Sequence, residues 1–255
     1  MITTSTIALL CGFAFMAGFI DSIVGGGGLI QLPAMLLLLP GVPVPTVLGT
    51  GKVSSLAGTL VALQRYAGRV PIRWRTVGLA AVTAALFAVL GARVVSYLPT
   101  QLVRPLVLGL LVVIALYTFW RKDFGQRHAP RLSGRRELVY GVLLGVGLGF
   151  YDGFFGPGMG SFLLFSFVGL FGYDFLTASG SSKLVNAATN ITSLVYFAYT
   201  DQVLYRVGLP MAACNVLGAT LGTRLALQRG TGFVRILFLV VVGGIILKLG
   251  WETLM

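Results

Sequence analysis

Apolar stretches long enough to cross a lipid bilayer constrain the fold of this chain more than any other feature. A membrane helix needs about 20 predominantly apolar residues. Stretches of that kind lie at 46–64, 76–98, 103–120, 177–199, 207–227 and 233–251. Only 10% of the residues are charged, whereas soluble domains carry about 25%. The sequence therefore predicts an all-α polytopic membrane protein, and it excludes a soluble enzyme, a disordered chain and a disulfide scaffold.

Two further apolar regions, 4–39 and 138–171, are each interrupted by glycines near the middle. The first interruption reads DSIVGGGG and begins at Asp21, and the second reads DGFFGPGMG and begins at Asp152. About eleven residues follow each interruption before the next loop, and at 1.5 Å per residue they span roughly half a bilayer. We expect each region to be a helix, a break near mid-membrane and a half-length helix.

The two halves of the chain repeat each other. When they are shifted by 131 positions they align without a gap, and the shift superposes residue types that are rare in membrane helices. The matched pairs include Gly18 with Gly149, Asp21 with Asp152, Gly49 with Gly180, Lys52 with Lys183, Arg93 with Arg224 and Trp120 with Trp251. Internal repeats are found in many transporters. The sequence predicts two homologous repeats, 1–121 and 138–255, each with a glycine-broken helical hairpin and three transmembrane helices.

Basic residues indicate the orientation, because cytoplasmic loops are rich in lysine and arginine. The linker at 122–137 and the segment at 65–75 are both basic, so we expect both to be cytoplasmic. Two arrangements of the repeats remain open. If each broken region enters and leaves on one side, the repeats are inverted; if each crosses once, they are parallel. The short second arms and a slight excess of basic residues inside favour inverted repeats.

The glycine breaks predict an anion site. A helix that starts after a break presents unpaired N–H groups and about half a positive charge, and glycine lets a ligand approach those groups closely. The candidate binding residues at the breaks are Gly25, Gly26, Gly27, Gly28, Gly156, Gly158 and Gly160. The alternative is a pair of packing kinks, because glycine is common where membrane helices cross.

Two lysines lie inside membrane-length helices, where a charge is costly. Lys52 shares a helix face with Ser55 and Thr59, because these residues follow it by three and seven positions. At the matching positions of the second repeat, Lys183 shares a face with Asn186 and Asn190. A cation followed by hydrogen-bond donors suits an oxyanion. The alternative is that the lysines snorkel to the interface while the polar residues join helices.

Asp21 and Asp152 precede the two breaks. A membrane aspartate can pair with a lysine, cap a helix or carry a proton. We interpret both residues as braces of the broken backbone, and proton coupling is the less favoured alternative.

Other chemistry is not indicated. A net charge of +12 suggests nucleic acid only when the charge lies on a solvated face, so we expect no nucleic-acid partner. His128 is the single histidine and lies in the linker, so we expect neither a metal nor hydrolase chemistry. No dinucleotide fingerprint is present. The sequence therefore predicts no catalytic residues and no cofactor.

Two repeated motifs, GFIDSIVGGGGLIQLPAML with GFYDGFFGPGMGSFLLF and TGKVSSLAGT with SSKLVNAATN, resemble those of the sulfite exporter TauE/SafE family, also called the 4-toluenesulfonate uptake permeases. The resemblance covers the whole chain. It implies a bacterial inner-membrane protein that moves sulfur-containing oxyanions, sulfonates or related organic acids. By position it implicates residues 25–28, Lys52, residues 156–160, Lys183 and Asn186. Pro157 and Met159 replace two glycines of the first copy, so the two halves of any site differ.

Together these features predict a secondary transporter that moves a small anion, sulfite or an organosulfonate, by alternating access. The bilayer and the anion are its expected partners. The coupling ion is left open, with a proton among the candidates. The alternatives are a carrier of carboxylates or other organic anions, an anion channel, and a membrane scaffold that transports nothing.

Overall fold

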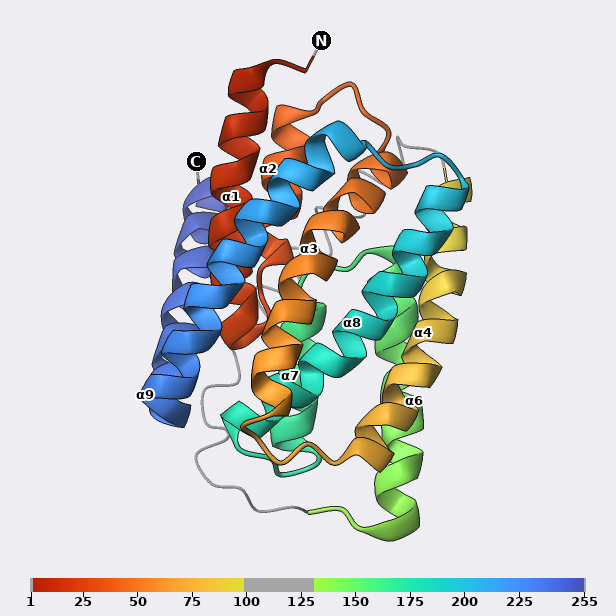
Figure 1. Ribbon diagram of the computed structural model, residues 1–255, viewed down its shortest axis with the longest axis vertical. Helices are drawn as coiled ribbons and strands as arrows, with labels where there is room; N and C mark the ends of the chain where they lie inside the picture. Colours follow the sequence, from red (N-terminus) through yellow and green to blue (C-terminus); the bar gives the residue numbers. More distant parts are fainter. Residues whose placement is uncertain (1, 99–130, 255) are drawn as a thin grey trace.

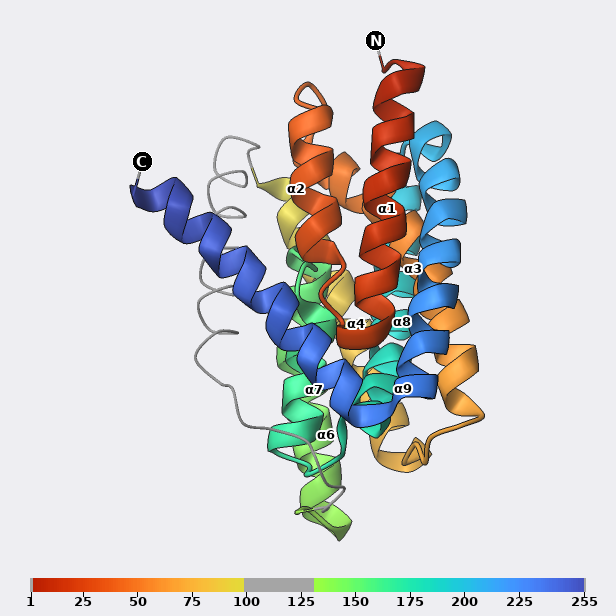
Figure 2. The same cartoon turned by 90° about the vertical axis from the view of Figure 1, so that its left-hand side faces the viewer.

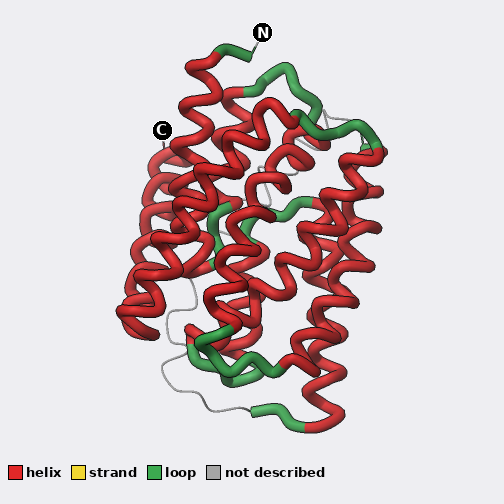
Figure 3. The backbone as a smooth tube through the Cα atoms, viewed as in Figure 1, coloured by secondary structure: helices red, strands yellow, loops and turns green. Residues whose placement is uncertain are grey.

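The computed structural model describes residues 2–98 and 131–254, with side chains described as far as Gly230. Within these ranges the chain is helical and contains no strand (Figures 1 and 3), which confirms the predicted all-α fold. The helices are α1 (Thr4–Val24), α2 (Gly28–Leu38), α3 (Val44–Ala67), α4 (Trp74–Tyr97), α6 (Gly134–Phe154), α7 (Met159–Gly169), α8 (Phe175–Tyr199) and α9 (Tyr205–Leu254), which has a kink at Gly230.

The helices fall where the sequence predicts membrane spans. Four of them, α1, α3, α4 and α6, are long and apolar enough to cross a membrane. The predicted spans at 46–64, 76–98 and 177–199 coincide with α3, α4 and α8, and those at 207–227 and 233–251 lie along α9. The span predicted at 103–120 lies outside the described residues. The chain is a multi-pass membrane protein.

Each glycine-broken region forms a helical hairpin. In Figure 1, α1 descends and α2 turns back toward the end where α1 began. Helix α6 rises from the lower end of the molecule, and α7 turns back toward that lower end. Figure 2 shows the same arrangement from the side. The two half-length helices, α2 and α7, therefore start near the middle of the bundle and point away from each other.

The backbone at the two breaks requires glycine. Gly25 ends α1 with a φ of 81°, and Gly156 and Gly158 have φ values of 93° and 82°. Residues with a Cβ rarely adopt this left-handed conformation. The breaks also touch, because the Ser161 amide donates to the Gly25 carbonyl over 3.1 Å, and a Cβ on Gly25 would collide with the backbone of Gly160. This contact brings the starts of α2 and α7 together.

The helices pack crosswise between the two halves of the chain. Helix α1 packs along α9, α4 packs along α6, and α3 and α8 meet in the centre. Glycines allow the close approach: Gly91 of α4 lies against the Phe150 carbonyl of α6, and Gly222 of α9 lies against the Phe19 carbonyl of α1. Small residues that let backbones approach are the usual means of packing membrane helices.

The last residues assigned to the linker belong to a helix. Residues 134–137 form the first turn of α6, and the buried carboxylate of Glu137 in this turn is held by two partners. The Arg73 guanidinium donates to both of its oxygens, over 3.1 and 3.0 Å, and the Tyr173 hydroxyl donates over 2.9 Å. Burial and the neighbouring Glu137 raise the pKa of Tyr173, so its hydroxyl remains a donor at physiological pH.

Candidate functional site

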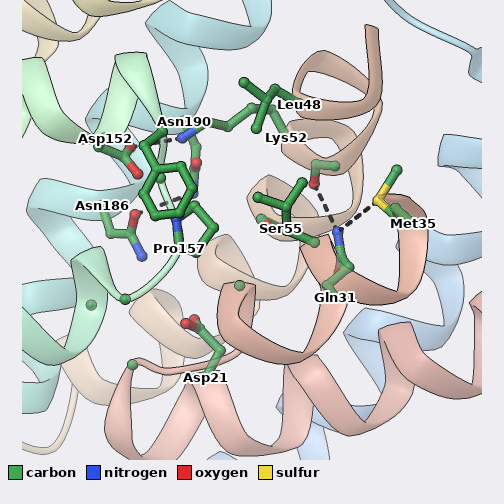
Figure 4. Close-up of a pocket in the computed structure, with 18 of the residues that line it drawn as sticks. Asp21, Gln31, Met35, Leu48, Lys52, Ser55, Asp152, Pro157, Asn186 and Asn190 are labelled. Atoms are coloured by element: carbon green, nitrogen blue, oxygen red, sulfur yellow. Dashed lines mark hydrogen bonds and ion pairs between the residues drawn. The ribbon is translucent and has the colours of Figure 1, made fainter. Parts of the chain in front are cut away.

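A small cavity lies where the two breaks meet. Its volume is about 60 Å³, and about 10–15 Å³ of cavity volume measured in this way is enough to hold one water molecule. Six helices, α1, α2, α3, α6, α7 and α8, contribute to its wall, together with both breaks. Its lining residues include Asp21, Gly25, Gly28, Gln31, Lys52, Ser55, Asp152, Phe155, Gly156, Pro157, Gly158, Gly160, Asn186 and Asn190. Figure 4 shows Lys52 reaching from α3 toward Asp152 on α6, with Asp21 on another side of the same space.

Lys52 forms a buried ion pair with Asp152. The ammonium nitrogen lies 2.8 Å from a carboxylate oxygen, and the two residues are 6% and 2% exposed. This contact excludes the alternative in which Lys52 snorkels to the membrane surface. It also means that the cation predicted to meet an anion is neutralised by a protein carboxylate.

Lys183 forms the matching ion pair with Asp21. Its ammonium lies 2.7 Å from an Asp21 carboxylate oxygen and also donates to the Asp21 main-chain carbonyl. The other carboxylate oxygen of Asp21 accepts from the Gly27 amide over 3.4 Å. Each lysine thus pairs with the aspartate of the other half of the chain. Asp21 ties the first break to α8, as a brace of that backbone would.

The starts of α2 and α7 leave backbone amides free at the cavity. The amides of Leu29 and Gln31 donate to the carbonyls of Gly26 and Gly27, and those of Ser161 and Phe162 donate to Gly25 and Gly158. Among the described residues, the amides of Gly28, Gly158 and Gly160 have no hydrogen-bond partner. All three glycines line the cavity. An unpaired amide at a helix start is a donor for an anion.

The predicted donor faces reach the cavity only in part. Ser55, Asn186 and Asn190 line it. The side-chain amide of Asn190 donates to the side-chain oxygen of Asn186 over 3.4 Å. Thr59 is buried elsewhere, and its hydroxyl has no partner among the described residues. Lys183, Gly26 and Gly27 also lie outside the lining.

Gln31 is a lining residue that the sequence analysis missed. It is 3% exposed and lies in the first turn of α2. Its side chain donates to the Gly51 carbonyl over 3.2 Å and accepts from Ser54 and Asn215. The signal was present in the sequence, because a glutamine inside an apolar half-helix needs a partner for its amide. Gln31 joins α2 to α3 and α9 beside the cavity.

The charges around the cavity sum to zero. Two ammonium groups and two carboxylates form the two ion pairs, and each pair is internally neutral. The described residues contain no cluster of histidine, cysteine and acidic side chains that would hold a metal. The polar groups that remain for a ligand are therefore the unpaired backbone amides, the Ser55 hydroxyl and the asparagine side chains. The Lys52 ammonium becomes available only if it leaves Asp152.

Comparison with known proteins assigns the chain to a class. The family model described as sulfite exporter TauE/SafE matches residues 10–249. The chain is 37% identical to the probable membrane transporter protein ORF9 of Sinorhizobium sp. over 92% of its length and 88% of that protein. It is 34% identical to a probable membrane transporter protein of Haemophilus influenzae over 90% and 88%, and 32% identical to YfcA of Escherichia coli K12 over 99% and 93%. No solved structure matches the chain.

The fold and these matches define a multi-pass membrane transporter. The chain belongs to the sulfite exporter TauE/SafE family.

Proposed function

We propose that this protein is a secondary transporter that moves a small anion, sulfite or a small organosulfonate, across the bacterial inner membrane. The observation that carries the proposal is the cavity between the two half-helix starts. Lys52 and the glycines whose amides have no partner all line this cavity. An ammonium group and unpaired helix-start amides are donors that suit the oxygen atoms of an oxyanion.

The repeated sequence supports alternating access as the mechanism. Helices α3 and α8 begin at Val44 and Phe175, and α4 and α9 begin at Trp74 and Tyr205, so both pairs of starts are 131 positions apart. In Figure 1, α1 and α6 run in opposite directions, as do α3 and α8. We infer two inverted repeats, 1–121 and 138–255, joined by a cytoplasmic linker. Rocking of one inverted repeat against the other exposes a central site to each side in turn.

The cavity volume supports a small substrate. A space of about 60 Å³ accommodates an ion of four or five heavy atoms, since about 10–15 Å³ of cavity volume measured in this way holds one water-sized group. The aryl group of a toluenesulfonate requires more room than this state offers. We therefore place sulfite and short organosulfonates ahead of aromatic sulfonates.

A thermal-shift panel on the purified protein tests this proposal. The panel contains sulfite, sulfate, thiosulfate, taurine, sulfoacetate and small carboxylates. A ligand at one hundred times its Kd stabilises the folded state by about 2.7 kcal/mol. We expect a shift with sulfite or a sulfonate, and we expect Lys52→Gln to remove it while Arg69→Gln, which removes an exposed cation outside the cavity, retains it. Shifts with carboxylates alone would move the substrate to organic acids. No shift with any anion would contradict the proposal.

A further inference from the structure

The two ion pairs that match by sequence position differ in their surroundings. Lys52 and Asp152 both line the cavity, whereas in the other pair Asp21 lines it and Lys183 does not. Both carboxylate oxygens of Asp21 are used, one by Lys183 and one by the Gly27 amide. Asp152 uses one oxygen for Lys52, and among the described residues no hydrogen bond reaches its other oxygen. Of the two carboxylates at the cavity, Asp152 is therefore the one with an oxygen that no donor occupies among the described residues.

An anion that enters this neutral site adds a net negative charge unless a proton accompanies it. A buried ion is stable only when it is paired, and in the resting state the Lys52 ammonium already has a partner in Asp152. If Lys52 turned to an incoming anion, the Asp152 carboxylate would be left buried at 2% exposure without a counter-charge. A proton on Asp152 removes that deficit, because the carboxyl is then neutral and Lys52 pairs with the anion.

We propose that Asp152 binds a proton whenever the cavity binds an anion, so that the two ions cross the membrane together. This inference rests on the proposed function. Lys52 exchanges the Asp152 carboxylate for the anion, and the proton adds to the carboxylate oxygen. With a monovalent anion the total charge of the site is unchanged by loading, and the gradients of the two ions set the direction of transport.

The groups around Asp152 are neutral or already paired, so Asp152 is the residue that accepts the proton. Helix α3 contributes Lys52, and α1 contributes Asp21, which is held by Lys183 of α8. Tyr151 lies beside Asp152 on α6, and its hydroxyl is used as a donor to the Pro157 carbonyl. From α8 the cavity receives the neutral Asn186 and Asn190, and α4 approaches α6 through the backbone of Ala88 and Gly91.

Proton uptake on anion binding is the measurement that tests this inference. The probes are methanesulfonate and sulfate, whose own protonation does not change near neutral pH, added to protein in lightly buffered detergent solution with a pH indicator. We expect close to one proton taken up per bound methanesulfonate. We also expect the affinity to fall by up to tenfold for each unit of rising pH, because deprotonated Asp152 must regain its proton before the anion is held.

Asparagine variants locate the proton. Asp152→Asn is expected to bind methanesulfonate without proton uptake and with an affinity that no longer depends on pH. Asp21→Asn is expected to retain proton uptake for each anion it binds. Asp201→Asn replaces an exposed loop aspartate with φ of 56°, a conformation that asparagine tolerates, and it controls for the loss of a carboxylate.

The outcomes separate this inference from the proposed function. Anion binding by the wild-type protein without proton uptake and without pH dependence would overturn the proton inference alone. Uptake that persists in Asp152→Asn and disappears in Asp21→Asn would also overturn it. The absence of any anion binding would overturn the proposed function and this inference with it. If Asp152→Asn fails to fold, the wild-type uptake and pH dependence still decide whether a proton is bound.

Discussion

The Lys52 ammonium lies 2.8 Å from the Asp152 carboxylate, and this contact joins residues one hundred positions apart at the wall of the central cavity. Its counterpart, between Lys183 and Asp21, joins the same two halves of the chain in the opposite sense. The two pairs hold the breaks in place while the cavity remains neutral. Mutation can separate two roles of these pairs: their contribution to the stability of the fold, and the ability of a lysine to leave its aspartate for an anion.

Lys52→Met should destabilise the protein more than the double variant Lys52→Met/Asp152→Leu. Removing one partner of a buried ion pair leaves the other charge uncompensated and costs about 3–5 kcal/mol, whereas replacing both with apolar residues is often neutral. Thermal unfolding in detergent measures the difference. We expect the double variant to recover most of the lost stability and to remain unable to bind anions. Equal destabilisation by the single and double variants would contradict the pairing.

Gly25→Ala should disrupt the fold at the point where the breaks touch. Its φ of 81° is unfavourable for alanine by about 1–2 kcal/mol, and the added Cβ would also collide with the backbone of Gly160. Gly41→Ala is the matched control, because a Cβ there meets nothing within 4 Å. We expect a large loss of folded protein in gel filtration for the first variant only. Similar yields of both would contradict the close contact of the breaks.

Thr59→Val should leave anion binding unchanged and raise stability. The Thr59 hydroxyl is buried without a partner among the described residues, and an unsatisfied buried polar group costs about 1–3 kcal/mol. Ser55→Ala, one turn earlier on α3, should instead weaken anion binding about twofold to tenfold, the range that a lost hydrogen bond of about 0.5–1.5 kcal/mol allows. Thermal unfolding and anion titration of the two variants check both expectations. Weaker binding in Thr59→Val would place the site further along α3.

Inverted repeats predict that both chain ends lie on the side of the membrane opposite the basic linker. Single cysteines near residue 2 and near residue 254, introduced after Cys11 and Cys214 are replaced, should react with a membrane-impermeant thiol reagent in intact cells. A cysteine in the linker should react only after lysis. Parallel repeats place the C-terminus on the cytoplasmic side, so protection of the C-terminal cysteine in intact cells would contradict the inverted arrangement.

The sequence was sufficient to predict the helices and the breaks, because these depend on local patterns. Apolar length predicts the spans, and the glycines mark both breaks to within a residue or two of Gly28 and Met159, where the half-helices begin. The shift of 131 positions identified both lysines and both aspartates. The crosswise pairing of these charges was beyond local patterns, because it depends on how the two halves pack against each other.

The composition of the cavity also depends on packing. Seven residues along a helix rise about 10 Å, so Lys52 and Thr59 cannot both reach a small cavity, and the structure places Lys52 and Ser55 there. On α8 the cavity receives Asn186 and Asn190 but not Lys183. The two matching faces therefore meet the cavity at different heights, and this makes the site asymmetric in spite of the repeated sequence.

A structure of the protein with selenite tests the central claim most directly. Selenite resembles sulfite in shape and charge, and its selenium is located by anomalous scattering. We expect one selenium in the central cavity, with its oxygens within hydrogen-bond distance of Lys52 and the amides of Gly28 and Gly160, and no such site in Lys52→Gln. Selenium bound only elsewhere, for example among Arg65, Arg69 and Arg224 at the end of α3, or an empty cavity at saturating selenite, would contradict the account.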